Sequence, residues 1–86
     1  MKSTEDFSVY LLQSEKSGIY YVGIAQDINA RLKEHNRGKS KFTKGHIPWE
    51  LIYQEYVGNV KLARKKEKYY KSSSGKKSLL KRIFKG

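Results

Sequence analysis

One carboxylate in this sequence stands where an unpaired charge would be costly. The segment VKLARKKEKYYK has the i, i+3, i+7, i+10 spacing of an inward helix stripe at Val60, Ala63, Glu67 and Tyr70. A carboxylate on that stripe must be paired or bind a metal. An ion pair with a neighbouring Lys or Arg is one interpretation of Glu67. The other is a Mg²⁺ site completed by water and substrate phosphates.

Two of the seven tyrosines, Tyr10 and Tyr21, lie in segments that we expect to pair as strands. A four-residue loop that sets Gln13 opposite Gly18 places Tyr10 directly opposite Tyr21, and opposed residues share one face of a sheet. A phenol has a pKa of about 10, so a phenol that acts as a base near neutral pH must lose about three pKa units. Nearby cations and a metal could supply part of that change. Packing is the alternative role for each tyrosine.

Arg31 and His35 lie one turn apart on an expected helix that also carries Ile28 and Leu32. Arg31 could favour an ionised tyrosine and hold the charge of a phosphate as a transition state forms. His35 is either a partly buried histidine hydrogen-bonded to the sheet or a supporting group or alternative base. His46 is expected to be exposed to solvent. No glycine-rich phosphate loop, metalloprotease helix motif or hydrolase nucleophile elbow occurs.

The elements that must position these side chains follow from periodicity and caps. We expect strands at 7–13, 18–25 and 49–57, helices at 28–37, 60–71 and 74–85, and a basic loop at 39–48. Asp27, Asn59 and Ser74 are the expected N-caps, and Gly38 stops the first helix. The order ββαβαα predicts an α+β fold, with a three-stranded antiparallel sheet flanked by helices. We expect one domain over residues 1–86, with its core at about 7–71 and a basic helix at 74–85.

Charge points to a polyanionic partner. The chain has 19 Lys+Arg against 8 Asp+Glu, a net charge of +11, and residues 60–86 hold eleven basic residues and one acidic residue, Glu67. Neutralised phosphates release counterions, so nucleic acid is the expected partner, ahead of a merely solvated surface. The expected contacts share positive charge in the basic loop and the second helix: Lys39, Lys41, Lys44, Arg64, Lys65, Lys68 and Lys71.

Other classes of protein are disfavoured by composition. A membrane-surface role is less favoured because the basic segment lacks a broad apolar face, and we find neither a secretory signal nor a segment long enough to span a bilayer. The absence of cysteine excludes disulfides and thiolate zinc sites. We therefore expect a cytoplasmic protein.

Several short motifs, taken in order, resemble the GIY-YIG nuclease family. They share the family's order and spacing: VYLL at 9–12, YVGI at 21–24, RLKEHN at 31–36, GK at 38–39, TKG at 43–45, PWEL at 48–51, and Ala63 with Glu67. The likeness covers about residues 7–71 and is strongest to small stand-alone bacterial members. The letters GIY at 18–20 spell the family's first motif, but they directly precede Tyr21, whereas the family carries its two tyrosines on separate, adjacent strands. Residues 8–10 are therefore the true counterpart of the first motif. Tyr20 should then face away from Tyr21.

The resemblance implies a metal-dependent endonuclease that cuts phosphodiester bonds, in DNA more than RNA, as in repair members of the UvrC kind. Tyr21 would be the general base for a water, assisted by Tyr10, and Arg31 would stabilise the phosphate. Glu67 would hold one Mg²⁺ or Mn²⁺, which stabilises the leaving oxygen. The chain departs from repair-type members at Ile24, where they carry lysine, and Leu79, where they carry asparagine. The alternatives are a nucleic-acid-binding module with little or no cleavage and, more weakly, a partner of an acidic protein.

Overall fold

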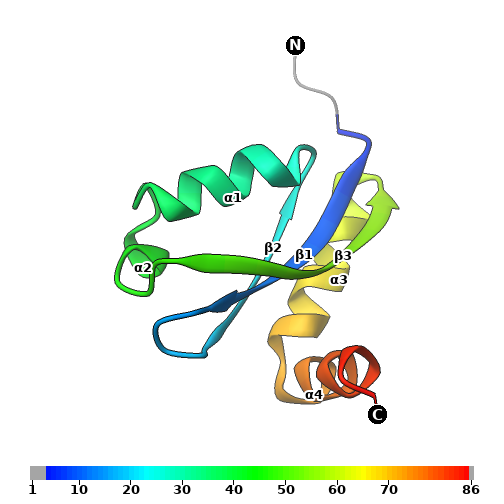
Figure 1. Cartoon of the computed structure of the whole chain (residues 1–86). Coiled ribbons are helices and arrows are strands. Elements are labelled where there is room, and N and C mark those ends of the chain that lie inside the picture. Colours follow the sequence, from blue (N-terminus) through cyan, green and yellow to red (C-terminus); the bar gives the residue numbers. More distant parts are fainter. Residues whose placement is uncertain (1–3, 86) are drawn as a thin grey trace.

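The computed structural model describes residues 4–85 as one sheet with helices on both sides (Figure 1). The elements follow in the order β1 (Phe7–Ser14), β2 (Tyr20–Ala25), α1 (Ile28–Asn36), α2 (Lys41–Lys44), β3 (Trp49–Gly58), α3 (Val60–Lys71) and α4 (Ser73–Ile83). The strands are antiparallel and lie in the order β2-β1-β3. The predicted α+β class and element order are confirmed. The short α2 interrupts the segment that was expected to be a loop.

The central strand β1 is buried on both faces. Val9 and Leu11 point toward α3 and α4, whereas Tyr10 and Leu12 point toward the opposite face, beneath α1. Successive residues of a strand alternate between faces, so one buried strand serves two separate cores. Tyr20 packs in the first core and Tyr21 against the second, which confirms that these adjacent tyrosines face opposite sides.

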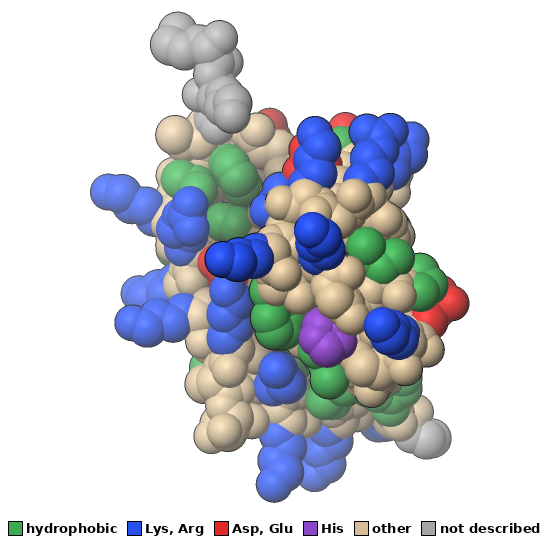
Figure 2. Space-filling model, turned by 90° about the vertical axis from the view of Figure 1, so that its left-hand side faces the viewer, with side chains coloured by type: hydrophobic (Ala, Val, Ile, Leu, Met, Phe, Trp, Pro, Cys, Tyr) green, Lys and Arg blue, Asp and Glu red, His purple; other side chains and the backbone are tan. Residues whose placement is uncertain are grey.

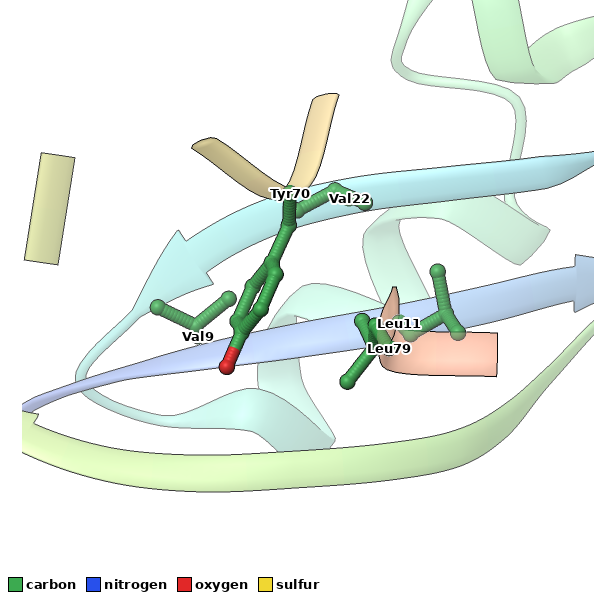
Figure 3. Close-up of a cluster of buried hydrophobic side chains, with 5 residues drawn as sticks. All are labelled: Val9, Leu11, Val22, Tyr70 and Leu79. Carbon is green, nitrogen blue, oxygen red and sulfur yellow. The ribbon is translucent and has the colours of Figure 1, made fainter. Parts of the chain in front are cut away.

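Figure 3 shows the core on the α3 and α4 side, where five side chains from four elements meet. Val9, Leu11, Val22, Tyr70 and Leu79 are each at most 3% exposed. The Tyr70 ring lies between the helices and the sheet, and its hydroxyl points toward β3, where it donates to Oε1 of Glu55 at 2.7 Å. This contact fixes α3 against the sheet and thereby sets the position of its neighbour one turn back, Glu67.

The β1–β2 pairing differs from the predicted register. Tyr10 pairs with Gly23, and Tyr21 pairs with Leu12, so the prediction that the two tyrosines stand directly opposite was wrong by two residues. A shift of two residues preserves the face on which a side chain projects. Tyr10 and Tyr21 therefore still share one face of the sheet.

The hairpin loop explains the shifted register. The Ser14 amide donates to the Ile19 carbonyl at 2.9 Å, so the loop comprises residues 15–18 rather than 14–17. Gly18 has a φ of +79°, a left-handed conformation that belongs in the turn and not in the first position of a strand. The Ser14 hydroxyl accepts hydrogen bonds from the amides of Lys16 and Ser17, which stabilises the turn.

Helix ends follow the predicted caps in three of four cases. Asp27 accepts from the Ala30 amide at 3.1 Å, Asn59 accepts from the Lys61 amide at 2.8 Å, and Gly38 follows α1 with a φ of +80°. The prediction that Ser74 caps the last helix was wrong.

The last helix instead begins one residue earlier than expected, with Ser72 as its N-cap. The Ser72 hydroxyl accepts from the Gly75 amide at 3.1 Å and donates to the Tyr69 carbonyl at 2.6 Å. A β-carbon at Gly75 would lie 1.8 Å from that carbonyl oxygen, so glycine allows α4 to start directly against the end of α3. Within residues 4–85 no helix is long and apolar enough to cross a bilayer.

Candidate active site

Two tyrosines from adjacent strands form the centre of the candidate site. The ring centroids of Tyr10 and Tyr21 are 6.4 Å apart with 38° between the ring planes. Tyr10 is 1% exposed, whereas Tyr21 is half-buried and reaches the surface. Of the two phenols, Tyr21 is therefore the one that a water or a substrate can contact.

Gly23 makes room for Tyr10. A β-carbon at Gly23 would lie 2.4 Å from the Tyr10 hydroxyl oxygen and 2.5 Å from the ring carbon that carries it. The Tyr10 ring thus crosses the backbone of β2, which is an edge strand of the sheet. Sequence reasoning placed Gly23 in a motif and gave it no role, because the need for a missing side chain appears only with the ring in place.

A chain of polar contacts runs inward from Tyr10. Its hydroxyl oxygen lies 3.0 Å from Nε2 of His35, and Nδ1 of His35 lies 2.9 Å from the Thr43 hydroxyl. The Thr43 hydroxyl faces the Ser40 carbonyl at 3.4 Å. If Thr43 donates to that carbonyl, it accepts from Nδ1–H, and Nε2 is left to accept from Tyr10. His35 is thus a buried histidine hydrogen-bonded to the sheet, and it contacts a candidate catalytic tyrosine.

The ionisation of these two buried groups follows from their surroundings. Burial raises the pKa of Tyr10 to about 12, and the neighbouring Tyr21 adds to the rise, while Arg31 opposes it. Burial also lowers the pKa of His35 below its ordinary value, helped by the Arg31 charge. Tyr10 therefore stays protonated and His35 stays neutral near pH 7, which suits a hydrogen bond between them.

Arg31 lies at the edge of this cluster. Its Nη1 is 2.6 Å from Oε1 of Glu34, and both side chains are 43% exposed. An ion pair this exposed contributes about 0–1 kcal/mol and can open without much cost. The guanidinium carries five N–H donors, so donors remain for an anion.

Glu67 approaches the tyrosines from α3. Its neighbours on the helix stripe, Ala63 and Tyr70, are 0% and 3% exposed, which confirms the inward orientation expected for Glu67. Oε2 of Glu67 lies 3.1 Å from Nζ of Lys71, and that Nζ lies 5.9 Å from the Tyr21 ring centroid. The negative charge of Glu67 also acts to raise the pKa of Tyr10. The charges of Glu67 and Lys71 therefore act on the two tyrosines of the candidate site.

A metal at this site would depend on Glu67 for its protein ligand. Among residues 4–85, no cluster of three or more His, Asp or Glu side chains could hold a metal. Mg²⁺ keeps several waters and often binds through one carboxylate plus substrate phosphates. Glu67, whose side chain is 17% exposed, fits that kind of ion and not a metal that requires an all-protein cage.

The predicted nucleic-acid contacts divide between two surfaces. Helical geometry puts Arg64, Lys68 and Lys71 on the flank of α3 next to Glu67. Lys65 instead lines an apolar surface with Leu62 and Tyr69, on the outer side of α3. Of these four helix cations, Lys71 contacts the Tyr21 ring, Arg64 and Lys68 share its flank of the helix, and Lys65 lies apart.

The other basic residues come from the segment around α2. Lys39, Lys41 and Lys44 are exposed. Figure 2 views the molecule from the side of α2 and the β1–β2 turn of Figure 1, and Lys and Arg side chains spread over this face while acidic ones are few. A polyanion that contacts α2 would meet a face with little opposing negative charge.

Three residues without predicted roles hold α1, α2 and β3 together. The Asn36 side chain donates to the Trp49 carbonyl at 3.1 Å and accepts from the Trp49 amide at 2.6 Å. The Trp49 indole donates to the Thr43 carbonyl at 2.8 Å. All three lie within motifs of the sequence, which was the available signal. His46, expected to be exposed, is half-buried, and its Nδ1 lies 2.9 Å from the Ser17 hydroxyl.

Comparison with known proteins finds relatives over most of the chain. The GIY-YIG catalytic domain model matches residues 6–81. UPF0213 proteins of Staphylococcus aureus strains Mu3, Mu50 and N315 are each 39% identical to the chain over 72 residues, which cover 83% of this chain and 87% of each relative. Their names state no activity. No solved structure matches the chain.

Proposed function

The chain belongs to the GIY-YIG family, and from this premise we propose that it is a metal-dependent endonuclease that hydrolyses phosphodiester bonds in nucleic acid, DNA more than RNA. The observation that carries the proposal is the proximity of Tyr21, Tyr10 and the Glu67–Lys71 pair, which come from three different elements. A purely structural ion pair would not need to sit beside two tyrosines. We also propose a cytoplasmic location and, by likeness to repair members of the family, a role in DNA repair.

Tyr21 is the proposed general base. Its ring reaches the surface, so its oxygen can accept a proton from a water that attacks phosphorus. The Lys71 ammonium lies 5.9 Å from the centroid of this ring, so a cation stands beside the proposed base. Tyr10 has a pKa of about 12 and its hydroxyl is held by His35, so its proposed role is to support Tyr21 as a neutral ring fixed beside it.

Arg31 and Glu67 act on the phosphate in this proposal. Negative charge grows on the phosphate oxygens in the transition state, and an exposed guanidinium can hold it once Glu34 releases its donor. Glu67 would hold one Mg²⁺ or Mn²⁺, and such an ion supplies stabilisation of the leaving oxygen when bound. Lys71 must then move from Glu67 to a phosphate, and its half-exposed side chain is free to do so.

A second candidate is a nucleic-acid-binding module with little or no cleavage. Leu79, at the position where repair-type members carry asparagine, is 1% exposed and packs against β1 and α3. That position therefore serves the core in this chain and offers no polar group to a substrate. The Glu67–Lys71 ion pair also neutralises the one proposed metal ligand.

One experiment separates the two candidates. Labelled duplex, flap, junction and single-stranded substrates are incubated with the protein in Mn²⁺, in Mg²⁺ and in EDTA. The endonuclease hypothesis predicts cleavage of at least one substrate in Mn²⁺ or Mg²⁺ and no cleavage in EDTA. Binding to the same substrates without cleavage in any metal would favour the binding module.

A further inference from the structure

Phe42 is an aromatic side chain that the fold holds out into solvent. It is 55% exposed on α2, whereas the next residue, Thr43, is fully buried. Thr43 contacts His35 through its hydroxyl and accepts from the Trp49 indole through its carbonyl. These contacts fix the short helix, so the outward direction of Phe42 is set by the same residue that completes the polar chain from Tyr10.

The Phe42 ring extends the aromatic surface of the candidate site. Its centroid lies 6.0 Å from that of Tyr21, with only 28° between the planes, an offset stacked arrangement. On another side it lies 5.6 Å from the His46 ring. The proposed general base thus has, directly beside it, a flat aromatic group that remains more than half exposed.

Lysines flank Phe42 in the chain, and another lies over its neighbour Tyr21. Lys41 precedes Phe42 in the chain, Lys44 follows two residues later, and both are exposed. Lys71 lies over the Tyr21 ring. Proteins that bind single-stranded nucleic acid combine lysines and arginines that follow the backbone with aromatic rings on which bases stack.

We propose that Phe42 is a stacking surface for an unpaired nucleobase, so that the substrate is single-stranded or carries an unpaired nucleotide next to the cleaved phosphate. This inference rests on the proposed function, because it assigns a substrate class to the same site. A base inside a duplex has both faces stacked on its neighbours and cannot lie on Phe42. An unpaired base can, and its phosphates then stay beside Tyr21 and the lysines.

The test measures binding in EDTA, so that cleavage plays no part. A single strand carrying 2-aminopurine and a duplex of the same sequence are titrated with the wild type and with Phe42→Leu, Phe42→Trp and Phe84→Leu. Phe84 is the matched control, because it is also an exposed phenylalanine, at 59%, and it lies directly after α4. Melting temperatures of all variants confirm that they are folded.

We expect Phe42→Leu to weaken single-strand binding at least about fivefold and to leave duplex binding unchanged. The quenching of 2-aminopurine fluorescence by stacking should be lost with Phe42→Leu and kept with Phe42→Trp. Phe84→Leu should change neither affinity. A single strand with abasic sites keeps the charges and removes the bases. The wild type and Phe42→Leu should therefore bind this abasic strand with the same affinity.

Two results would overturn the inference and one would remove its premise. If Phe42→Leu weakens duplex and single strand alike, or no more than Phe84→Leu does, Phe42 is not a stacking surface. If 2-aminopurine stays quenched with Phe42→Leu, the base stacks elsewhere. In both cases salt-dependent binding would still support the proposed function. If the wild type binds neither nucleic acid, both proposals are wrong.

Discussion

The Tyr10 ring crosses β2 at Gly23, so closely that a β-carbon on Gly23 would lie 2.4 Å from the phenolic oxygen. A ring from the central strand therefore reaches the sheet edge where Tyr21 lies only because its neighbour lacks a side chain. The position of the phenol, and its contact with His35, depend on that glycine.

Gly23→Ala should destabilise the protein by about 1–3 kcal/mol, because the methyl group must displace a buried ring or the backbone of β2. Denaturant unfolding gives the free energy. Gly45→Ala is the control, since its φ of −78° is ordinary and a β-carbon there meets nothing within 4 Å. Equal stability of Gly23→Ala and the wild type would mean that Tyr10 does not occupy this position.

Acidifying the solution should lower the free energy of unfolding, because His35 must then take up a proton. Its pKa is lowered in the folded state, so below the unfolded value of about 6.5 the unfolded chain binds more protons. The contribution is therefore fully present above about pH 6.5 and is lost as pH falls from there toward the lower, folded-state pKa. Unfolding free energies at about pH 7.5 and 5.5 measure the difference.

His35→Gln should reduce this pH difference, and His46→Gln should leave it in place. The comparison matters because both substitutions remove one imidazole while only His35 is fully buried beside Tyr10. If His46→Gln reduces the difference as much as His35→Gln, the pH dependence does not come from the Tyr10–His35 contact.

Lys71→Gln should weaken nucleic-acid binding more than Lys65→Gln. Lys71 lies beside Tyr21, whereas Lys65 lies on the outer side of α3 with Leu62 and Tyr69. Wild-type affinity should fall steeply between about 50 and 200 mM salt. Losing one phosphate contact should reduce the slope of log affinity against log salt concentration by about one. A flat salt response would contradict binding through phosphate contacts, and equal effects of the two variants would contradict a contact surface on the Lys71 side of α3.

The sequence predicted the sheet, the helices and the shared face of the tyrosines, because these depend on periodicity and on local caps. It did not predict the register, since Gly18 can either start a strand or close a turn, and only the pairing of Ser14 with Ile19 decides. Ser72 and Ser74 are equally good caps in isolation. The choice between them depends on the packing of Gly75 against the end of α3.

Those parts of the site that depend on the type of one residue could be predicted from the sequence. Those that depend on tertiary contacts between distant residues could not. Glu67 was identified because a carboxylate interrupts an apolar stripe. Thr43 and Phe42 could not be assigned, because the expected loop gave no reason to bury one and expose the other. Their roles come from tertiary contacts with His35 and Tyr21, residues that are distant in sequence.

Plasmid nicking by Glu67→Gln tests the central claim most directly. The substitution keeps the side-chain shape, and because Lys71 is half exposed the lost ion pair should cost less than about 1 kcal/mol. Melting temperature, nicking of supercoiled plasmid in Mn²⁺ and DNA binding are measured on one preparation, with the exposed Glu50→Gln as control. We expect Glu67→Gln to fold, to bind DNA at least as tightly as the wild type, and to lose nicking, while Glu50→Gln keeps it. A well-folded Glu67→Gln protein that nicks at the wild-type rate would contradict the account.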